Sequence, residues 1–254
     1  MRIHIGTSGY QYRHWNNGVF YPRGVKDRLA YALAHMTAIE INSSFYRIPP
    51  PDTVAAWAGV LPEGSRMVLK APQSVTHRRR LKLHSEGGVR QGAELLAYFI
   101  SGALRIAPDK RGPVLLQLPG QMQIDLARLE PVLALLAEHG LRAALEIRHA
   151  SWFVAATLSL LERYGAALVA SDWPEFSTPL VRTCDFLYLR RHGPGALYAS
   201  SYDDDALLAD LAQLHAHRTV PTDSAYVFFN NDIHGHAPHD AMRMMALLAH
   251  MPSN

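Results

Sequence analysis

Eight short apolar runs recur along this 254-residue chain, and segments with the spacing of helices separate most of them. The runs span residues 3–9, 38–42, 66–71, 114–118, 143–148, 167–172, 186–192 and 226–231. Strands that alternate with helices form right-handed βαβ units, whose strands lie parallel in one sheet. Eight such units in about 250 residues are typical of a closed (β/α)8 barrel. The sequence therefore predicts an α/β fold with a single TIM-type barrel.

An open, doubly wound sheet is the main alternative architecture. A dinucleotide-binding sheet of that kind carries a glycine-rich phosphate turn, G-x-G-x-x-G, after its first strand. The corresponding stretch here is GTSGY at residues 6–10, which lacks that spacing. The closed barrel remains the prediction, and it is expected to take in residues 1–254 as one domain.

Capping residues predict the ends of several helices. Ser151 is the expected N-cap of a helix that stops at Gly165. The acidic residues 203–205 suit the start of another helix, because negative charge is favourable at a helix N-terminus. A last helix is expected to start near Pro238.

Proline limits helix formation in two other segments. Helical spacing covers residues 126–139, and Pro131 must either kink this helix or begin its main part. A helix is also expected over 92–104. The link 173–185 holds two prolines and little periodicity, so the connection between the sixth and seventh strands is expected to be short or irregular.

Composition excludes several classes of protein. The hydrophobic fraction of 48% and the charged fraction of 19% are ordinary for a globular domain, and a net charge of +3 requires no particular partner. Cys184 is the single cysteine, which excludes an internal disulfide. Residues 1–6 do not resemble a signal peptide, and no apolar run approaches the roughly 20 residues of a membrane span. The expected location is the cytoplasm, away from membranes, and the oligomeric state is undetermined.

Polar residues gather near the carboxyl ends of the predicted strands, where the active sites of TIM barrels lie. Alternation along the strands predicts that the following side chains point inward or lie at the strand ends: Ser8, Glu40, Asn42, Lys70, Gln117, Glu146, Arg148, Asp172, Arg190, His192 and Asn230. A barrel interior filled only by packing carries mostly branched apolar residues. The pattern therefore predicts a polar cavity to which every strand contributes.

The favoured interpretation is an enzyme that uses acid–base chemistry on a small anionic or polyhydroxylated substrate. The candidate catalytic residues are Glu146, His192, Lys70 and Asp172. The candidate substrate-binding residues are Ser8, Asn42, Tyr46, Gln117, Arg148, Arg190, Tyr202 and Asn230, while Glu40 is expected to support them. Arginine and lysine suit a substrate carboxylate or phosphate, and an aromatic ring at the barrel mouth can stack on a sugar.

Purely structural roles are the alternative for several of these residues. Glu40 and Glu146 can simply pair with a basic neighbour, and His4, which lies deepest, is expected to be structural. A lysine between apolar walls and guanidinium groups can have a lowered pKa and act as a base or form a Schiff base. For Lys70, a plain ion pair with one of the two glutamates is the simpler expectation.

A divalent metal site is a second hypothesis, although no cofactor is predicted. Its ligands would be Glu40, Glu146, Asp172, Asp232 and His236, in an enzyme similar in chemistry to sugar isomerases or phosphodiester hydrolases. Nearby fixed positive charge opposes such a site. The metal is therefore not favoured.

A non-catalytic module that binds nucleic acid or another ligand is a third hypothesis, and it would use the basic loop 78–80 together with aromatic residues at the barrel mouth. Residues 78–80 are three consecutive arginines after the third predicted strand, and such a loop can contact a phosphate backbone. A solvated basic loop explains the same pattern more simply. Nucleic acid is therefore an unfavoured partner, and the favoured one is a small molecule.

Longer motifs recur along almost the whole chain. They are IGTSGY at 5–10, EINSSFYRIP at 40–49, VLKAP at 68–72, LLQLP at 115–119, LEIRHASWF at 145–153, SDW at 171–173, YLRRHGP at 188–194 and YVFFNNDIHGHAPHDA at 226–241. In these motifs the chain resembles the YecE-like family, which is built on domain of unknown function 72 (DUF72). The resemblance implies a (β/α)8-type barrel and no assigned activity.

The resemblance also bears on individual residues. Its motifs contain most of the inward-facing set, and they bring in His149 and Asn231 as supporting residues. His234 and His239 lie outside the family pattern, which weakens a metal site made of three histidines. Residues 78–80 are more basic than the corresponding family loop, so a nucleic-acid role would be particular to this chain.

Overall fold

Eight parallel strands build the sheet in the computed structural model, which describes residues 1–84, 92–219 and 224–251. They are β1 (Arg2–Ser8), β2 (Ala38–Ile41), β3 (Arg66–Leu69), β4 (Val114–Gln117), β5 (Ala143–Glu146), β6 (Ala167–Ser171), β7 (Phe186–Arg191) and β8 (Ser224–Phe229). Their order in the sheet is β3-β2-β1-β8-β7-β6-β5-β4. Every pairing between neighbours is parallel.

The two ends of this sheet meet, so the sheet closes almost completely into a barrel. Isolated parallel bridges join Met67 to Arg111 and Lys70 to Leu115, between β3 and the segment containing β4. The amide of Ala71 donates to the carbonyl of Leu115 at 2.8 Å. The predicted (β/α)8 barrel is therefore confirmed.

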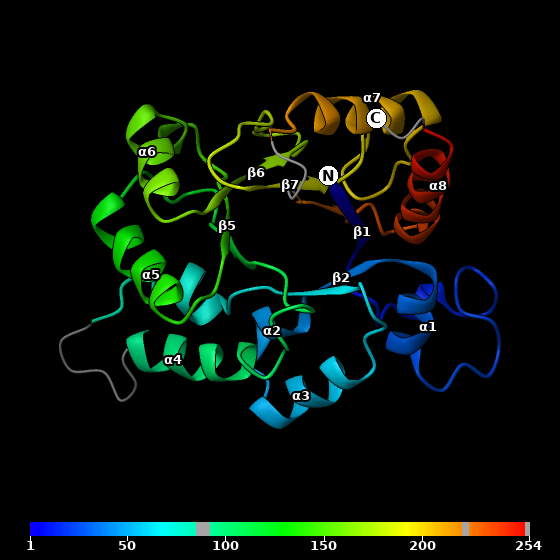
Figure 1. Ribbon diagram of the computed structural model, residues 1–254, viewed down its shortest axis with the longest axis horizontal. Coiled ribbons are helices and arrows are strands. Elements are labelled where there is room, and N and C mark those ends of the chain that lie inside the picture. The colour runs from blue at the N-terminus through cyan, green and yellow to red at the C-terminus, as the bar shows by residue number, and fades with distance from the viewer. Residues whose placement is uncertain (85–91, 220–223, 252–254) are drawn as a thin grey trace.

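Helices surround the strands on the outside (Figure 1). They are α1 (Arg28–His35), α2 (Ser43–Tyr46), α3 (Pro51–Gly59), α4 (Gly92–Ala103), α5 (Leu126–Glu138), α6 (Ala155–Arg163), α7 (Asp204–Ala216) and α8 (His236–His250). Three short turns of other helix types add η1 (Arg13–Trp15), η2 (Ser74–Arg78) and η3 (Ala150–Trp152). The link 172–185 between β6 and β7 is described throughout and contains no helix, as predicted.

The helix ends match the sequence prediction in part. Asp203 caps α7 by accepting a hydrogen bond from the amide of Ala206, and Gly165 follows α6 with a φ of 58°. The expected N-cap at Ser151 is wrong, because α6 begins only at Ala155. The Ser151 hydroxyl instead accepts a hydrogen bond from the amide of Ile124 at 2.9 Å, which ties the loop after β4 to the loop after β5.

Alternation along the strands separates two buried layers. One set of side chains fills the inside of the barrel, and it includes Val68, Leu115, Val169, Phe186 and Phe228. The other set packs the outside of the strands against the helices. The inside layer becomes polar toward the carboxyl ends of the strands, so the fold creates a polar chamber at that end.

Gly6 on β1 shows how closely two of the strands approach. A Cβ atom at this position would lie 1.9 Å from the carbonyl oxygen of Ala38, which is backbone and cannot move aside. Only glycine fits this contact.

No helix in the described part of the chain is both long enough and apolar enough to cross a membrane.

Candidate functional site

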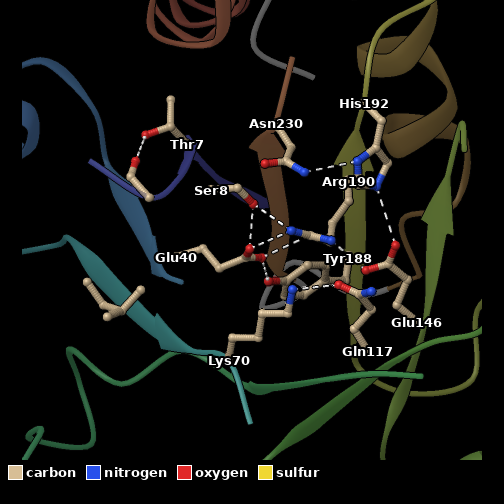
Figure 2. Close-up of polar contacts among 12 residues, drawn as sticks. Thr7, Ser8, Glu40, Lys70, Gln117, Glu146, Tyr188, Arg190, His192 and Asn230 are labelled. Atoms are coloured by element: carbon tan, nitrogen blue, oxygen red, sulfur yellow. Dashed lines mark hydrogen bonds and ion pairs between the residues drawn. The ribbon is translucent and has the colours of Figure 1, made fainter. Parts of the chain in front are cut away.

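Arg190 lies at the centre of the polar chamber, between two buried glutamates (Figure 2). Its Nη2 and Nε donate to Glu40 at 2.8 and 3.1 Å, and its Nη1 donates to Glu146 at 2.6 Å. Burial alone would lower the pKa of Arg190, but the two carboxylates outweigh it and raise that pKa above its ordinary value. The guanidinium therefore stays charged and links β2, β5 and β7.

Glu40 is held by neutral donors as well as by Arg190. The Tyr188 hydroxyl donates to its Oε2 at 2.7 Å, and the Ser8 hydroxyl donates to its Oε1. Burial and the Glu40 carboxylate raise the pKa of Tyr188 well above its usual range, so the phenol keeps its proton. Glu40 is completely buried, and the basic neighbour with which it pairs is Arg190.

Glu146 joins a second arginine and a histidine. Its Oε1 forms an ion pair with Nη2 of Arg148 and lies 3.3 Å from Nε2 of His192. Burial by itself would raise the pKa of Glu146, but Arg190 and Arg148 hold it well below its ordinary value. The Arg148 guanidinium also stacks over the ring of Trp173, with 3.6 Å between its Cζ and the ring centroid.

His192 has a partner on each ring nitrogen. Its Nδ1 lies 3.1 Å from the amide nitrogen of Asn230, which is a donor, and its Nε2 faces Glu146. Nη2 of Arg148 also lies 3.4 Å from Nε2, so this ring nitrogen contacts both a carboxylate and a guanidinium. Burial lowers the pKa of His192 and the Glu146 hydrogen bond opposes that shift only in part. The side chain is fully buried, so neither nitrogen is open to a ligand.

Lys70 differs from the other cations because no carboxylate pairs with it among the described residues. Its Nζ donates to Oε1 of Gln117 at 2.5 Å and lies 4.3 Å from the centroid of the Phe45 ring. The ion pair with Glu40 or Glu146 that the sequence suggested is thus wrong, because Arg190 and Arg148 occupy both carboxylates. Burial and the nearby Arg190 lower the pKa of Lys70 to about 7.

A cavity of about 280 Å³ opens above this lysine. It is lined by Asn42, Tyr46, Lys70, Gln117, Arg190, Tyr198, Asn230, Asp232 and Ile233. Tyr46 is 72% exposed and Ile233 is 53% exposed, so these two lie at the rim. The side-chain oxygen Oδ1 of Asn42 is buried and has no hydrogen-bond partner among the described residues.

Six of the predicted catalytic and binding residues line this cavity and six do not. Those lining it are Asn42, Tyr46, Lys70, Gln117, Arg190 and Asn230. Those outside its lining are Ser8, Glu146, Arg148, Asp172, His192 and Tyr202. Ser8, Glu146, Arg148 and His192 support the chamber from beneath or beside it through the contacts given above.

Asp172 and Tyr202 form a separate group at the edge of the chamber. The Asp172 carboxylate accepts a hydrogen bond from the amide of His192 at 2.6 Å and another from the Tyr202 hydroxyl. The Tyr202 hydroxyl in turn accepts from the amide of Gly193 at 2.7 Å. Ser171 is the last inward-facing residue of β6, so Asp172 points into the loops and fixes the end of β7.

The two supporting residues suggested by the resemblance act on loops. Nδ1 of His149 accepts from the amide of Ser151 and caps η3. The amide nitrogen of Asn231 donates to Asp240 at 2.6 Å and to the carbonyl of Ser200 at 2.9 Å, which joins α8 to the loop after β7.

The five residues of the metal hypothesis do not come together as ligands. Arginines hold Glu40 and Glu146, and Asp172 bonds to His192 and Tyr202 as described. Asp232 accepts from Nε1 of Trp15 at 2.5 Å and lies 3.3 Å from Nε2 of His14. Within residues 1–84, 92–219 and 224–251, no group of three or more His, Cys, Asp or Glu side chains is arranged to hold a metal ion.

Sequence reasoning missed Tyr198 and Ile233 as cavity residues. Tyr198 belongs to the loop after β7, has a φ of 61°, and packs edge to face on Trp173 and His192. The motif YLRRHGP ends at Pro194, before Tyr198. In this region the sequence analysis named Tyr202 as the substrate-binding residue. A loop that folds back over the strand ends leaves no periodic signal in the sequence.

The arginine run at 78–80 lies away from the chamber. Arg78, Arg79 and Arg80 line a separate surface hollow together with Lys82 and Arg128. Arg128 already pairs with Asp125 at 2.8 Å. The arginines of the nucleic-acid hypothesis thus line a different hollow from the strand-end cavity.

Amine labelling checks the environment of Lys70. We expect competitive labelling with fluorodinitrobenzene, read by mass spectrometry, to give Lys70 a midpoint near pH 7 because burial lowers its pKa to about 7. The exposed residues Lys26 and Lys82 serve as internal references for the reactivity of the reagent. A Lys70 midpoint above pH 9.5 would contradict the assigned environment.

Comparison with known proteins places this architecture. The family model described as "Protein of unknown function DUF72" matches residues 4–254. A DUF72 family protein from Thermotoga maritima has a crystal structure similar to this chain, with a TM-score of 0.78 and 25% identity over 98% of this chain and 100% of the other. A DUF72 family protein from Enterococcus faecalis gives 0.77 and 20% identity over 99% and 97%.

The comparison with curated proteins gives no match. The family model covers the chain from within β1 to its last residue, and the barrel contains every motif on which the resemblance rested. The chain therefore belongs to the DUF72 family.

Proposed function

We propose that the protein is an enzyme that uses acid–base chemistry on a small polyhydroxylated or anionic substrate, with Lys70 as the group that carries the proton. One observation supports this above the others. Lys70 presents an amine with a pKa of about 7 to a cavity of about 280 Å³, and its hydrogen-bond acceptor there is the neutral amide of Gln117. An acid–base catalyst works best when its pKa lies near the working pH.

The other candidate catalysts are less suited to proton transfer. Glu146 and His192 are fully buried outside the cavity lining, and each is engaged by neighbouring side chains. The low pKa of Glu146 makes it a poor base, since a base must accept a proton readily. Glu146 instead holds Arg190 and Arg148 in place, and His192 holds Asn230.

The lining of the cavity favours a sugar-sized substrate. Asn42, Gln117 and Asn230 supply amide donors and acceptors for hydroxyl groups, and the exposed ring of Tyr46 can stack on a sugar face. Arg190 has its charge balanced by two glutamates, so the amine of Lys70 is the basic group of the lining that has no carboxylate partner among the described residues.

Metal-dependent chemistry receives less support. The carboxylates that would bind a divalent ion are already occupied by arginines or by backbone and hydroxyl donors. The basic hollow at 78–80 would serve nucleic acid without involving the strand-end cavity, so that function would be independent of this one.

The pH dependence of turnover tests the proposal. A panel of sugars, sugar acids and sugar phosphates is screened in D2O by NMR for solvent deuterium incorporation or product. For a substrate found in this way, we expect kcat/KM to rise through pH 6–8 with a midpoint near 7, because the neutral amine of Lys70 is the base.

Variants connect that profile to the lysine. Lys70→Met is expected to lower kcat/KM by at least about 100-fold, the lower end of a general base's contribution. Lys26→Met removes the same charge from an exposed site and is expected to leave the rate unchanged. Turnover that survives in Lys70→Met with the same pH profile would exclude Lys70 as the base.

A further inference from the structure

A second cavity lies at the opposite end of the barrel, where the strands begin. Its volume is about 420 Å³, and its lining includes Arg2, Arg66, Arg111 and Arg142. Arg2 and Arg66 are the first residues of β1 and β3, while Arg142 directly precedes β5. Lys70 follows the carboxyl end of β3, so the depth of the barrel separates the two cavities.

Neutral groups hold two of these guanidinium groups. Nη1 of Arg66 donates to the carbonyl of Ser65 at 3.1 Å. Nε and Nη2 of Arg111 donate to the carbonyl of Ile106 at 2.9 and 2.6 Å. These bonds orient the side chains without neutralising them.

Arg142 is oriented by a ring. Its Cζ lies 4.1 Å from the centroid of Phe186, and its Nη2 contacts Asp185 at 2.7 Å. The Asp185 side chain is 74% exposed, so this surface pair neutralises the arginine weakly.

The floor of the cavity is aromatic and uncharged. The rings of His4 and Tyr226 stack with 5.2 Å between their centroids, and both residues are buried. Burial, together with Arg66 and Arg2, lowers the pKa of His4 to about 3, so the imidazole is neutral at physiological pH. His4 was expected to be structural because it lies deepest in the barrel. In the structure its side chain lines this basic cavity.

The described residues that line this cavity include four arginines and no acidic side chain. Glu63 and Asp109 line an adjoining hollow that shares Arg2 and Arg66, so they sit beside the basic cavity without lining it. Arginine forks match phosphate oxygens in pairs. An anion with several charges could therefore accept hydrogen bonds from several of these guanidinium groups at the same time.

We propose that this cavity binds a small molecule bearing two linked phosphate groups. This site lies at the opposite end of the barrel from the strand-end cavity, and binding there does not depend on the proposed enzyme activity. The site is concave and is lined by the starts of several strands, which suits a compact anion. A nucleic-acid strand would instead be expected to follow a longer basic surface.

Pyrophosphate is the probe for the test, titrated by isothermal calorimetry into the full chain at constant ionic strength. We expect one binding site, and at least tenfold weaker binding in both Arg66→Gln and Arg142→Gln. Arg13→Gln removes the same charge from an exposed position in η1 and is expected to change the affinity less than twofold. Lys70→Met is also expected to bind pyrophosphate as the original protein does. Circular dichroism confirms that each variant is folded.

Four results would overturn the proposal. They are no binding at millimolar pyrophosphate, equal weakening by Arg13→Gln, loss of binding in Lys70→Met, and displacement of pyrophosphate by a 20-nucleotide single strand at lower concentration. The third would place the anion in the strand-end cavity. The fourth would assign this basic end to nucleic acid.

Discussion

Replacing Arg190 with methionine is expected to destabilise the protein by about 3–5 kcal/mol, the range for breaking a buried ion pair by removing one partner. The substitution leaves Glu40 and Glu146 completely buried without their shared cation. Glu146 keeps Arg148, whereas Glu40 keeps only neutral hydroxyl donors among its described partners. Urea denaturation followed by circular dichroism measures the free energy of unfolding.

Two companion variants separate charge from packing. The triple variant Arg190→Met, Glu40→Gln, Glu146→Gln removes the carboxylates as well, and it is expected to recover part of the loss. Arg163→Met breaks an exposed pair with Glu130 and is expected to cost less than about 1 kcal/mol. A loss below 1 kcal/mol for Arg190→Met, or a triple variant less stable than the single one, would show that the chamber does not depend on this charge.

Replacing Lys70 with methionine is expected to stabilise the protein at neutral and acidic pH. The pKa of Lys70 is about 7 in the folded chain against an ordinary value of 10.5, so the unfolded state binds more protons between those pH values. Below pH 7 both states hold the proton, and the full penalty of burying the charge is present. As pH rises from 7 to 10.5 this penalty disappears, so stability rises.

Methionine carries no charge, so it avoids this penalty at every pH. The gain in the free energy of unfolding is therefore largest where the penalty is largest. We expect a gain on the order of 2–4 kcal/mol at pH 6 that shrinks toward zero near pH 10, since each pKa unit is worth about 1.4 kcal/mol. The lost hydrogen bond to Gln117 reduces this gain. Unfolding of both proteins in urea at pH 6, 8 and 10 measures it.

Lys26→Met is the control, because it removes the same charge from an exposed site. A Lys70→Met variant that is less stable than the original at pH 6 and equal at pH 10 would reverse the assigned sign. Higher stability combined with lost turnover would be the behaviour expected of a residue kept for function at a cost in folding free energy.

The periodicity of β2 illustrates what could be predicted locally. Alternation of Ile39 and Ile41 with Glu40 placed the carboxylate inside the barrel, and the structure finds it completely buried there. A strand has a period of two residues, so the face of a side chain depends on nearby sequence alone. The same rule found Lys70, Gln117, Arg190 and Asn230.

The partners of these side chains could not be predicted in the same way. Glu40 and Arg190 are 150 residues apart in the chain, and their bond depends on how strands at different positions in the barrel tilt and pair. The sequence indicated only that Glu40 can pair with a basic neighbour. Occupation of both glutamates by arginines then left Lys70 with an amide as its hydrogen-bond partner, while burial and the nearby Arg190 lower its pKa.

Residues beyond the strand ends were the least predictable. Asp172 follows β6 by one residue, which turns its carboxylate toward Tyr202 and the amide of His192. Tyr198 reaches the cavity because its loop folds back across the chamber. Ser151 ties two loops together where a helix cap was expected.

By itself, the sequence determined the barrel, the order of its elements and the set of polar side chains at its carboxyl end, because periodicity and capping act over a few residues. The tertiary structure decided which of those side chains are neutralised and which meet the cavity. Charge pairing and burial depend on distances between strands that are far apart in the chain. The same long-range closure brought four arginines together at the other end of the barrel, a grouping that no local pattern in the sequence marks.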